Sequence, residues 1–222
     1  ASLTITPTTL SISTTTNGTN QGAVSPADAA SLSLGMAVIG GGYANGTYIT
    51  AIDAVTGTIT FSQATATSAT AALTYETRNS YTGGTILSGG SIVLTNGAAN
   101  RWGLGTGAVT FNGGTLTLAG VTGSNGTDTG TFPNDLIVPA GQTGTLNMMQ
   151  RGRQSGSLTG GGTLNLVVKY IRGDFYGNWS DFTGQLNITA AQTGSEFRIA
   201  ENYAPDGYPN CAVNLGSNVI FK

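Results

Sequence analysis

The chain has 222 residues, of which 8% are charged, and its formal net charge is -2 at pH 7. This balance excludes the basic surface that binds nucleic acid, and the absence of any His removes the commonest general base and most zinc and copper sites. Hydrophobic residues make up 39% of the chain but never form a run of about 18 residues, so no membrane span is expected.

Short strands are predicted along the whole chain. Apolar and polar residues alternate in runs such as 58–61 and 115–118, and this period of two indicates strands. The 35 Gly residues, together with many Thr, Ser and Asn, supply the turns between them. One helix of one or two turns is expected between Ser25, which would cap it, and Ala30, with Pro26 in its first position.

The composition shifts near residue 76, and this shift predicts two parts. Residues 1 to 75 contain no Lys or Arg, and all eight basic residues lie from Arg78 onward. We interpret residues 1–76 as a small β unit of about six strands, or as a cap, because solenoids need caps that protect their open ends. Residues 77–222 would form the second part.

A Gly-[Thr/Ser/Gln]-[Leu/Ile] motif recurs after this boundary. Its copies begin at Gly84, Gly90, Gly114, Gly144, Gly162 and Gly184. In three copies the Leu is followed by Asn147, Asn165 or Asn187, and these residues lie 18 and 22 positions apart. Unequal spacing of about 20 residues is typical of a solenoid whose strands stay in register while its loops vary. The Leu residues would stack inward, and the Asn residues would form a ladder or settle the turns.

Two segments carry a family resemblance. Residues 81–94 read YTGGTILSGGSIVL, and residues 103–116 read GLGTGAVTFNGGTL. Both halves, in this order, resemble the autotransporter-associated β-strand repeat. The resemblance implies a right-handed parallel β-helix on the exterior of a bacterial cell. We therefore expect an all-β fold, a right-handed parallel β-helix (solenoid) with the small N-terminal β unit or cap.

The later part of the chain carries a second resemblance. Residues 177–187 read GNWSDFTGQLN, followed by FRIA at 197–200 and GYPN at 207–210. Residues 131–219 look like a Bacteroidetes extension of the repeat and are similar to β-helical carbohydrate-binding modules attached to xylanases. The resemblance implies a secreted or cell-surface bacterial protein with an appended catalytic domain. Its partner would be a plant polysaccharide, xylan or a related hemicellulose.

Polar and aromatic residues that follow the Leu-Asn strands form the candidate glycan surface. Sugar rings bind flat apolar faces, and their hydroxyls need polar partners. If the rungs stack in register about 4.8 Å apart, the segments after these strands emerge along one edge and could follow an extended glycan. Each residue has an alternative role, in a surface ion pair or in packing. The candidates are Arg151, Arg153, Tyr170, Arg172, Asp174, Tyr176, Trp179, Glu201 and Tyr203, with Trp102 in a Gly-rich turn.

Catalytic residues are harder to find, and we predict that the chain is not an enzyme. Its ten acidic residues are scattered, and only Asp174 with Asp181 or with Glu201 could approach as a glycosidase pair. No cofactor is expected, although residues 127–129 and 134–135 could offer oxygen ligands to calcium. Beside the non-catalytic carbohydrate-binding module, two alternatives stay open: a structural stalk or adhesin segment, and a divergent polysaccharide lyase.

Overall fold

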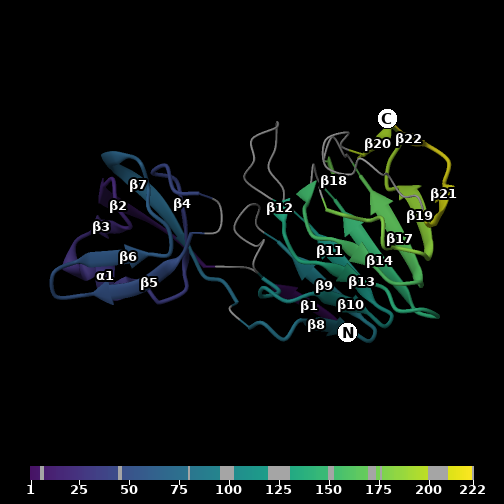
Figure 1. The fold of residues 1–222 in the computed structure, drawn as a ribbon, viewed down its shortest axis with the longest axis horizontal. Helices are drawn as coiled ribbons and strands as arrows, with labels where there is room; N and C mark the ends of the chain where they lie inside the picture. Colours follow the sequence, from purple (N-terminus) through teal and green to yellow (C-terminus); the bar gives the residue numbers. More distant parts are fainter. Residues whose placement is uncertain are drawn as a thin grey trace. The chain divides into compact units, whose positions relative to one another are not determined.

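The computed structural model describes residues 1–5, 8–44, 47–79, 81–95, 103–119, 131–149, 153–169, 174–175, 177–199 and 210–221. At residues 131, 153, 174, 175, 196–199 and 221 it describes the backbone alone. Strands account for 50% of the chain and helix for 4%, so the fold is all-β, as expected. The chain forms two compact units (Figure 1). The small unit is Pro7–Arg78, and the solenoid unit is Ala1–Thr6 with Asn79–Lys222.

The first strand of the chain belongs to the solenoid unit. β1 (Ser2–Ile5) pairs in parallel with β9 (Ser91–Leu94), so the small unit is an insertion between β1 and the rest of the solenoid unit. The expected division at residue 76 lies close to the end of this insertion. Residues 1–5, however, were expected in the N-terminal unit, because an alternating pattern identifies a strand without telling which sheet it joins.

The small unit is a six-stranded antiparallel sheet with one short helix among its described residues. The helix α1 (Pro26–Ser31) forms where the Ser-Pro signal predicts it, because Ser25 Oγ accepts a hydrogen bond from the Asp28 N–H at 3.0 Å. In the part of the chain that the structure describes, no helix is long and apolar enough to cross a membrane. The strands are, in spatial order, β4 (Ala37–Ile39), β7 (Ser68–Glu76), β2 (Thr9–Asn17), β3 (Gln21–Ala23), β6 (Thr58–Phe61) and β5 (Ile49–Asp53).

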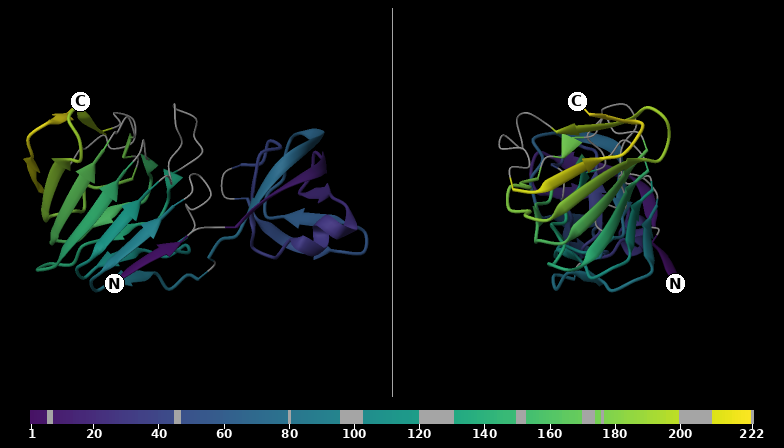
Figure 2. Two further views of the ribbon diagram at one scale, coloured as in Figure 1. Left: turned by 180° about the vertical axis from the view of Figure 1, so that it is seen from behind. Right: turned by 90° about the vertical axis from the view of Figure 1, so that its right-hand side faces the viewer.

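The solenoid unit is a parallel β-solenoid of about 4 turns, which confirms the expected parallel β-helix. Its described strands stack in rungs that form three walls (Figure 2). Wall A consists of β1, β9, β11 (Thr115–Leu118), β14 (Thr143–Met148), β17 (Thr163–Val168), β19 (Gln185–Ala190) and β21 (Ala212–Leu215). Wall B consists of β16 (Leu158–Thr159), β13 (Leu136–Ile137), β10 (Val109–Phe111) and β8 (Thr85–Leu87). Wall C consists of β12 (Thr131–Phe132), β15 (Arg153–Gln154), β18 (Asp174–Phe175), β20 (Ser195–Ile199) and β22 (Val219–Phe221).

Columns of aliphatic side chains fill the space between the walls. Leu116, Leu146, Leu166 and Ile188 are register partners on successive strands of wall A, and each is 0% exposed. Buried residues of all three walls form one continuous core. The predicted inward stacking of the Leu residues is therefore confirmed, and it leaves the alternate residues of each strand on the outer face.

The recurring Gly residues mark one corner of the solenoid. Gly90, Gly114, Gly162 and Gly184 each directly precede a strand of wall A, at the corner that follows wall B. Gly114 has a φ of 78°, which is left-handed and favours Gly, whereas Gly184 is needed for a different reason. A methyl group on Gly184 would collide with the Gly162 carbonyl oxygen of the rung below. The motif thus combines turn geometry with close approach of the backbones.

We expect the Gly184→Ala variant to destabilise the solenoid unit by about 1–3 kcal/mol, the usual cost of overpacking. Its added methyl group meets backbone, which cannot rotate away. Gly161→Ala is the matched control, because its methyl group would lie 3.4 Å from its nearest neighbour, Thr183 Oγ1. Both Trp residues of the chain belong to the solenoid unit, so urea unfolding followed by Trp fluorescence reports this unit alone. Equal stabilities of the two variants would contradict the expectation.

Candidate functional site

The outer face of wall A carries a ladder of small polar side chains. Asn187 Nδ2 donates to Asn165 Oδ1 at 2.9 Å, and Asn214 Nδ2 donates to Asn187 Oδ1 at 3.0 Å. None of the seven strands of wall A contains a charged residue. Some of the polar groups of the ladder thus form hydrogen bonds with the neighbouring rung. In register order it consists of Ser2, Ser91, Thr115, Thr145, Asn165, Asn187 and Asn214.

The expected ladder of Leu-Asn repeats is only partly found. Asn165 and Asn187 are partners in it, but Asn147 is offset by two residues and donates instead to Thr117 Oγ1 at 3.1 Å. The offset arises because Gly144 lies opposite Leu164, and the Phe111 ring occupies the space where a side chain on Gly144 would lie. An offset of two residues keeps the same side chains inward, since the period of a strand is two.

Wall C brings two of the predicted glycan-binding residues into register. Gln154 of β15 pairs with Phe175 of β18, and Asp174 pairs with Arg198 of β20. Arg153, which precedes Gln154, therefore shares one register position with Asp174 and Arg198 on three successive rungs. The segments after the Leu-Asn strands were expected to stack in this way, but Arg198 was not among the candidate residues.

Most other candidates lie outside the residues that the structure describes. These are Trp102, Arg151, Tyr170, Arg172, Tyr176, Glu201 and Tyr203. Their part in a glycan surface stays a prediction. The described aromatic side chains of the core do not contribute to one, because Phe111, Phe132 and Phe182 are 0% exposed.

Trp179 was predicted to contact a glycan, and this prediction is wrong. Its side chain is 1% exposed and belongs to the core of the solenoid unit, so no flat face is available to a sugar ring. The indole Nε1–H donates to Gln154 Oε1 at 3.3 Å. The sequence pattern around Trp179 was compatible with either glycan contact or core packing. In the structure the buried indole N–H has a partner in Gln154 on the rung below, as a core Trp requires.

A column of polar groups runs inside the solenoid beneath Trp179. Gln154 is 0% exposed, and its Nε2 donates to the Asn134 carbonyl oxygen at 3.1 Å. The Asn134 side chain, also buried, donates from Nδ2 to the Gly107 carbonyl oxygen at 2.7 Å. The column links three rungs where the chain passes from wall C to wall B. No pattern in the sequence marked Gln154, because a single buried Gln in a two-residue strand has no periodic signal.

The suggested calcium ligands at residues 134–135 have other roles. The Asn134 amide belongs to the polar column, and Asp135 Oδ1 accepts a hydrogen bond from the Ser157 N–H at 2.7 Å, fixing the corner of the next rung. Among the described residues, no three acidic or Cys side chains lie together in a way that could hold a metal ion. Residues 127–129 lie outside the described part of the chain.

The acidic residues proposed as a glycosidase pair are placed in different parts of a rung. Asp174 lies in wall C, whereas Asp181 is exposed and directly precedes Phe182, which bridges to Gly160 just beyond wall B. Glu201 lies outside the described residues.

Cys211 is partly buried against the core, and burial raises the pKa of its thiol, which keeps the thiol protonated at neutral pH. A protonated thiol is a weak nucleophile, so Cys211 is not activated for covalent catalysis.

We expect Gln154→Met to destabilise the solenoid unit by about 2–5 kcal/mol. The change keeps the side-chain volume but removes the acceptor of the Trp179 indole and the donor to the Asn134 carbonyl, at about 1–3 kcal/mol for each buried group. Gln142→Met at an exposed position is the control and should change stability by less than about 0.5 kcal/mol. Urea unfolding followed by Trp fluorescence measures both, and a loss at Gln154 no larger than the control would refute a structural role for the column.

No family model matches the chain, and neither a curated protein nor a solved structure matches it. The resemblances to the autotransporter-associated repeat and to xylanase-linked modules therefore rest on the quoted residues alone.

Proposed function

We propose that the solenoid unit is a structural segment, a stalk or adhesin element of a bacterial surface protein. The observation that carries the proposal is the outer face of wall A, where uncharged side chains hydrogen-bond from rung to rung. These hydrogen bonds join neighbouring rungs and so reinforce the stack. A binding face would be expected to keep exposed aromatic or charged groups for a ligand.

The interior supports the same proposal. Among the described residues, Phe111, Phe132, Trp179 and Phe182 fill the core, so these four aromatic side chains offer no stacking platform to a sugar. The polar column through Gln154 adds hydrogen bonds between rungs inside the walls. A segment whose side chains reinforce rung-to-rung pairing is suited to holding a length and a direction, which is the task of a stalk.

Glycan binding at wall C is the second candidate. The register of Arg153, Asp174 and Arg198 favours it, because three charged residues occupy one position on successive rungs. Rungs about 4.8 Å apart are close to the length of one sugar unit, so a linear glycan could meet each rung in turn. Arg donors and a carboxylate acceptor would orient its hydroxyls. A plant hemicellulose such as xylan is the ligand that the sequence resemblance implies.

The Asn187→Ala variant tests whether the ladder on wall A stabilises the solenoid unit. Asn187 accepts hydrogen bonds from Asn214 and Gln185 and donates to Asn165, so its loss should lower the stability of the solenoid unit by about 1–3 kcal/mol. Thr189→Ala, an exposed position on the same strand, is the control. A stability equal to that of the control would show that the ladder does not reinforce the stack.

Affinity electrophoresis of the 222-residue chain decides between the two candidates. The structural proposal expects no retardation on xylan, xyloglucan, pectin, β-glucan or cellulose. Retardation on one of them without loss of polymer viscosity would favour a binding module, and loss of viscosity would favour a lyase. If retardation is seen, Asp174→Ala should abolish it, whereas Asp28→Ala in the small unit should not. Retardation that survives Asp174→Ala would exclude wall C as the binding site.

A further inference from the structure

One corner of the solenoid unit carries an Asn-Gly pair. Asn112 directly follows β10, and Gly113 and Gly114 lead into β11 (Figure 1). β10 pairs with β8 on one side and with β13 on the other, and β11 pairs with β9 and β14. Described strands therefore stack on both sides of this corner, and the neighbouring rungs of the same unit set the surroundings of the pair.

The Asn112 side chain is exposed and is not held by the rest of the protein. Among the described residues, its carboxamide has no hydrogen-bond partner, and the Gly113 N–H donates to no acceptor. A methyl group placed on Gly113 would meet nothing closer than the Ser88 carbonyl oxygen, at 3.6 Å. The amide of Asn112 and the main-chain nitrogen that follows it are thus both accessible, with room on the side of the preceding rung.

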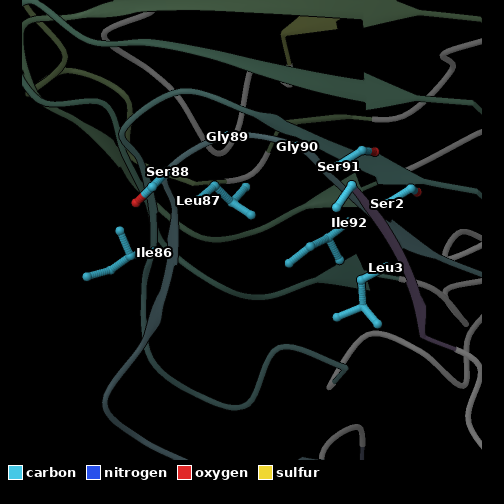
Figure 3. Close-up of a pocket in the computed structure, with 10 residues that line it drawn as sticks. Ser2, Leu3, Ile86, Leu87, Ser88, Gly89, Gly90, Ser91 and Ile92 are labelled. Atoms are coloured by element: carbon cyan, nitrogen blue, oxygen red, sulfur yellow. The ribbon is translucent and has the colours of Figure 1, made fainter.

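The preceding rung shows that this corner does not require an amide. Strands β8 and β10 are register partners, and three residues connect each of them to wall A. These residues are 88–90 in the preceding rung and 112–114 in the next, and both triplets end in Gly-Gly. Figure 3 shows Ser88 and the two Gly residues that follow it. The first position is therefore Ser88 in one rung and Asn112 in the other, so a Ser should also fit at position 112.

A second described Asn-Gly pair, Asn17-Gly18 in the small unit, is held in place. Asn17 is exposed as well, but its Oδ1 accepts hydrogen bonds from Thr19 Oγ1 at 2.5 Å and from the Thr19 N–H at 3.3 Å. Asn17 also ends β2 and pairs with Ser68 of β7, which fixes its backbone in the sheet. The two pairs share a sequence and an exposed position, and they differ in how firmly the structure holds the amide.

We propose that Asn112 is a deamidation site in the folded protein, whose reactants are the chain's own backbone and water. The Gly113 nitrogen, which no side chain hinders, bonds to Asn112 Cγ. The bond from Cγ to the amide nitrogen breaks, and the proton of the Gly113 nitrogen leaves with the ammonia, which gives a cyclic imide. Water then opens the ring at either carbonyl carbon. Opening at Cγ gives Asp, and opening at the main-chain carbonyl gives isoaspartate, in which the backbone runs through Cβ and Cγ.

The proposal goes beyond the proposed function, because it concerns a change of the chain with age and holds for a stalk and for a glycan-binding module alike. Either product adds a carboxylate to the corner. Isoaspartate also lengthens the main chain beside Gly114, where a methyl group would already lie 3.1 Å from the Gly89 carbonyl carbon. The corner has little space for a longer main chain, so the isoaspartate form should loosen the contact between the two rungs.

Ageing of the purified 222-residue chain in mildly alkaline buffer, followed by peptide fragmentation mass spectrometry, tests the proposal. Deamidation replaces an NH2 group by OH, and fragment ions assign this mass change to one residue. In the folded chain Asn112 should deamidate at least about tenfold faster than Asn17, because the hydrogen bonds of Asn17 must break before its amide can react. In concentrated urea the two rates should converge, since the shared Asn-Gly sequence then decides both.

The Asn112→Ser variant is the matched control, because it copies the residue of the preceding rung. It should unfold in urea like the wild type, and it should lack one acidic species that the aged wild type shows in ion-exchange chromatography. Fragment ions keep the Asn-Gly pairs at 45–46, 96–97 and 125–126, which lie outside the described residues, apart from the two compared here. An Asn112 that stays intact in the folded chain but reacts in urea would overturn the proposal. Equal rates at Asn112 and Asn17 in the folded chain would do the same.

Discussion

The parallel register between rungs is the constraint on which the rest of the solenoid unit depends. Neighbouring strands of wall A pair residue for residue, so one inward column of aliphatic side chains runs from Leu3 to Leu215. A slip of one residue would turn every side chain of a rung to the opposite face. Burial of the column and the hydrogen bonds between strands therefore fix the same arrangement.

The corners and the polar contacts follow from this register. Stacking rungs closely at the corner between walls B and A brings the Gly184 and Gly162 backbones together, so a side chain is excluded there. On the outer face, the repeated positions align Asn165, Asn187 and Asn214 for amide hydrogen bonds. Inside, the register aligns Trp179, Gln154 and Asn134 across three rungs. The packing of the core and the pairing of polar groups thus support one another.

The functional interpretation changes with these placements. The sequence patterns favoured a carbohydrate-binding module, because aromatic and charged residues cluster between residues 151 and 203. Burial of Trp179 removes one platform from that cluster, and the ladder on wall A gives a structural segment the stronger support. The register of Arg153, Asp174 and Arg198 keeps glycan binding at wall C as a specific second candidate.

Patterns in the sequence were enough to predict the all-β class, the stacked repeats with their Gly corners and inward Leu residues, and the helix start at Ser25. These features depend on local periodicity and turn chemistry, which a single segment carries. Three features became visible in the folded chain alone: β1 joins wall A rather than the small unit, Asn147 is offset from the ladder, and Trp179 belongs to the core. Each of these depends on which distant strand lies beside a given residue, and an alternating pattern fits several such partners equally well.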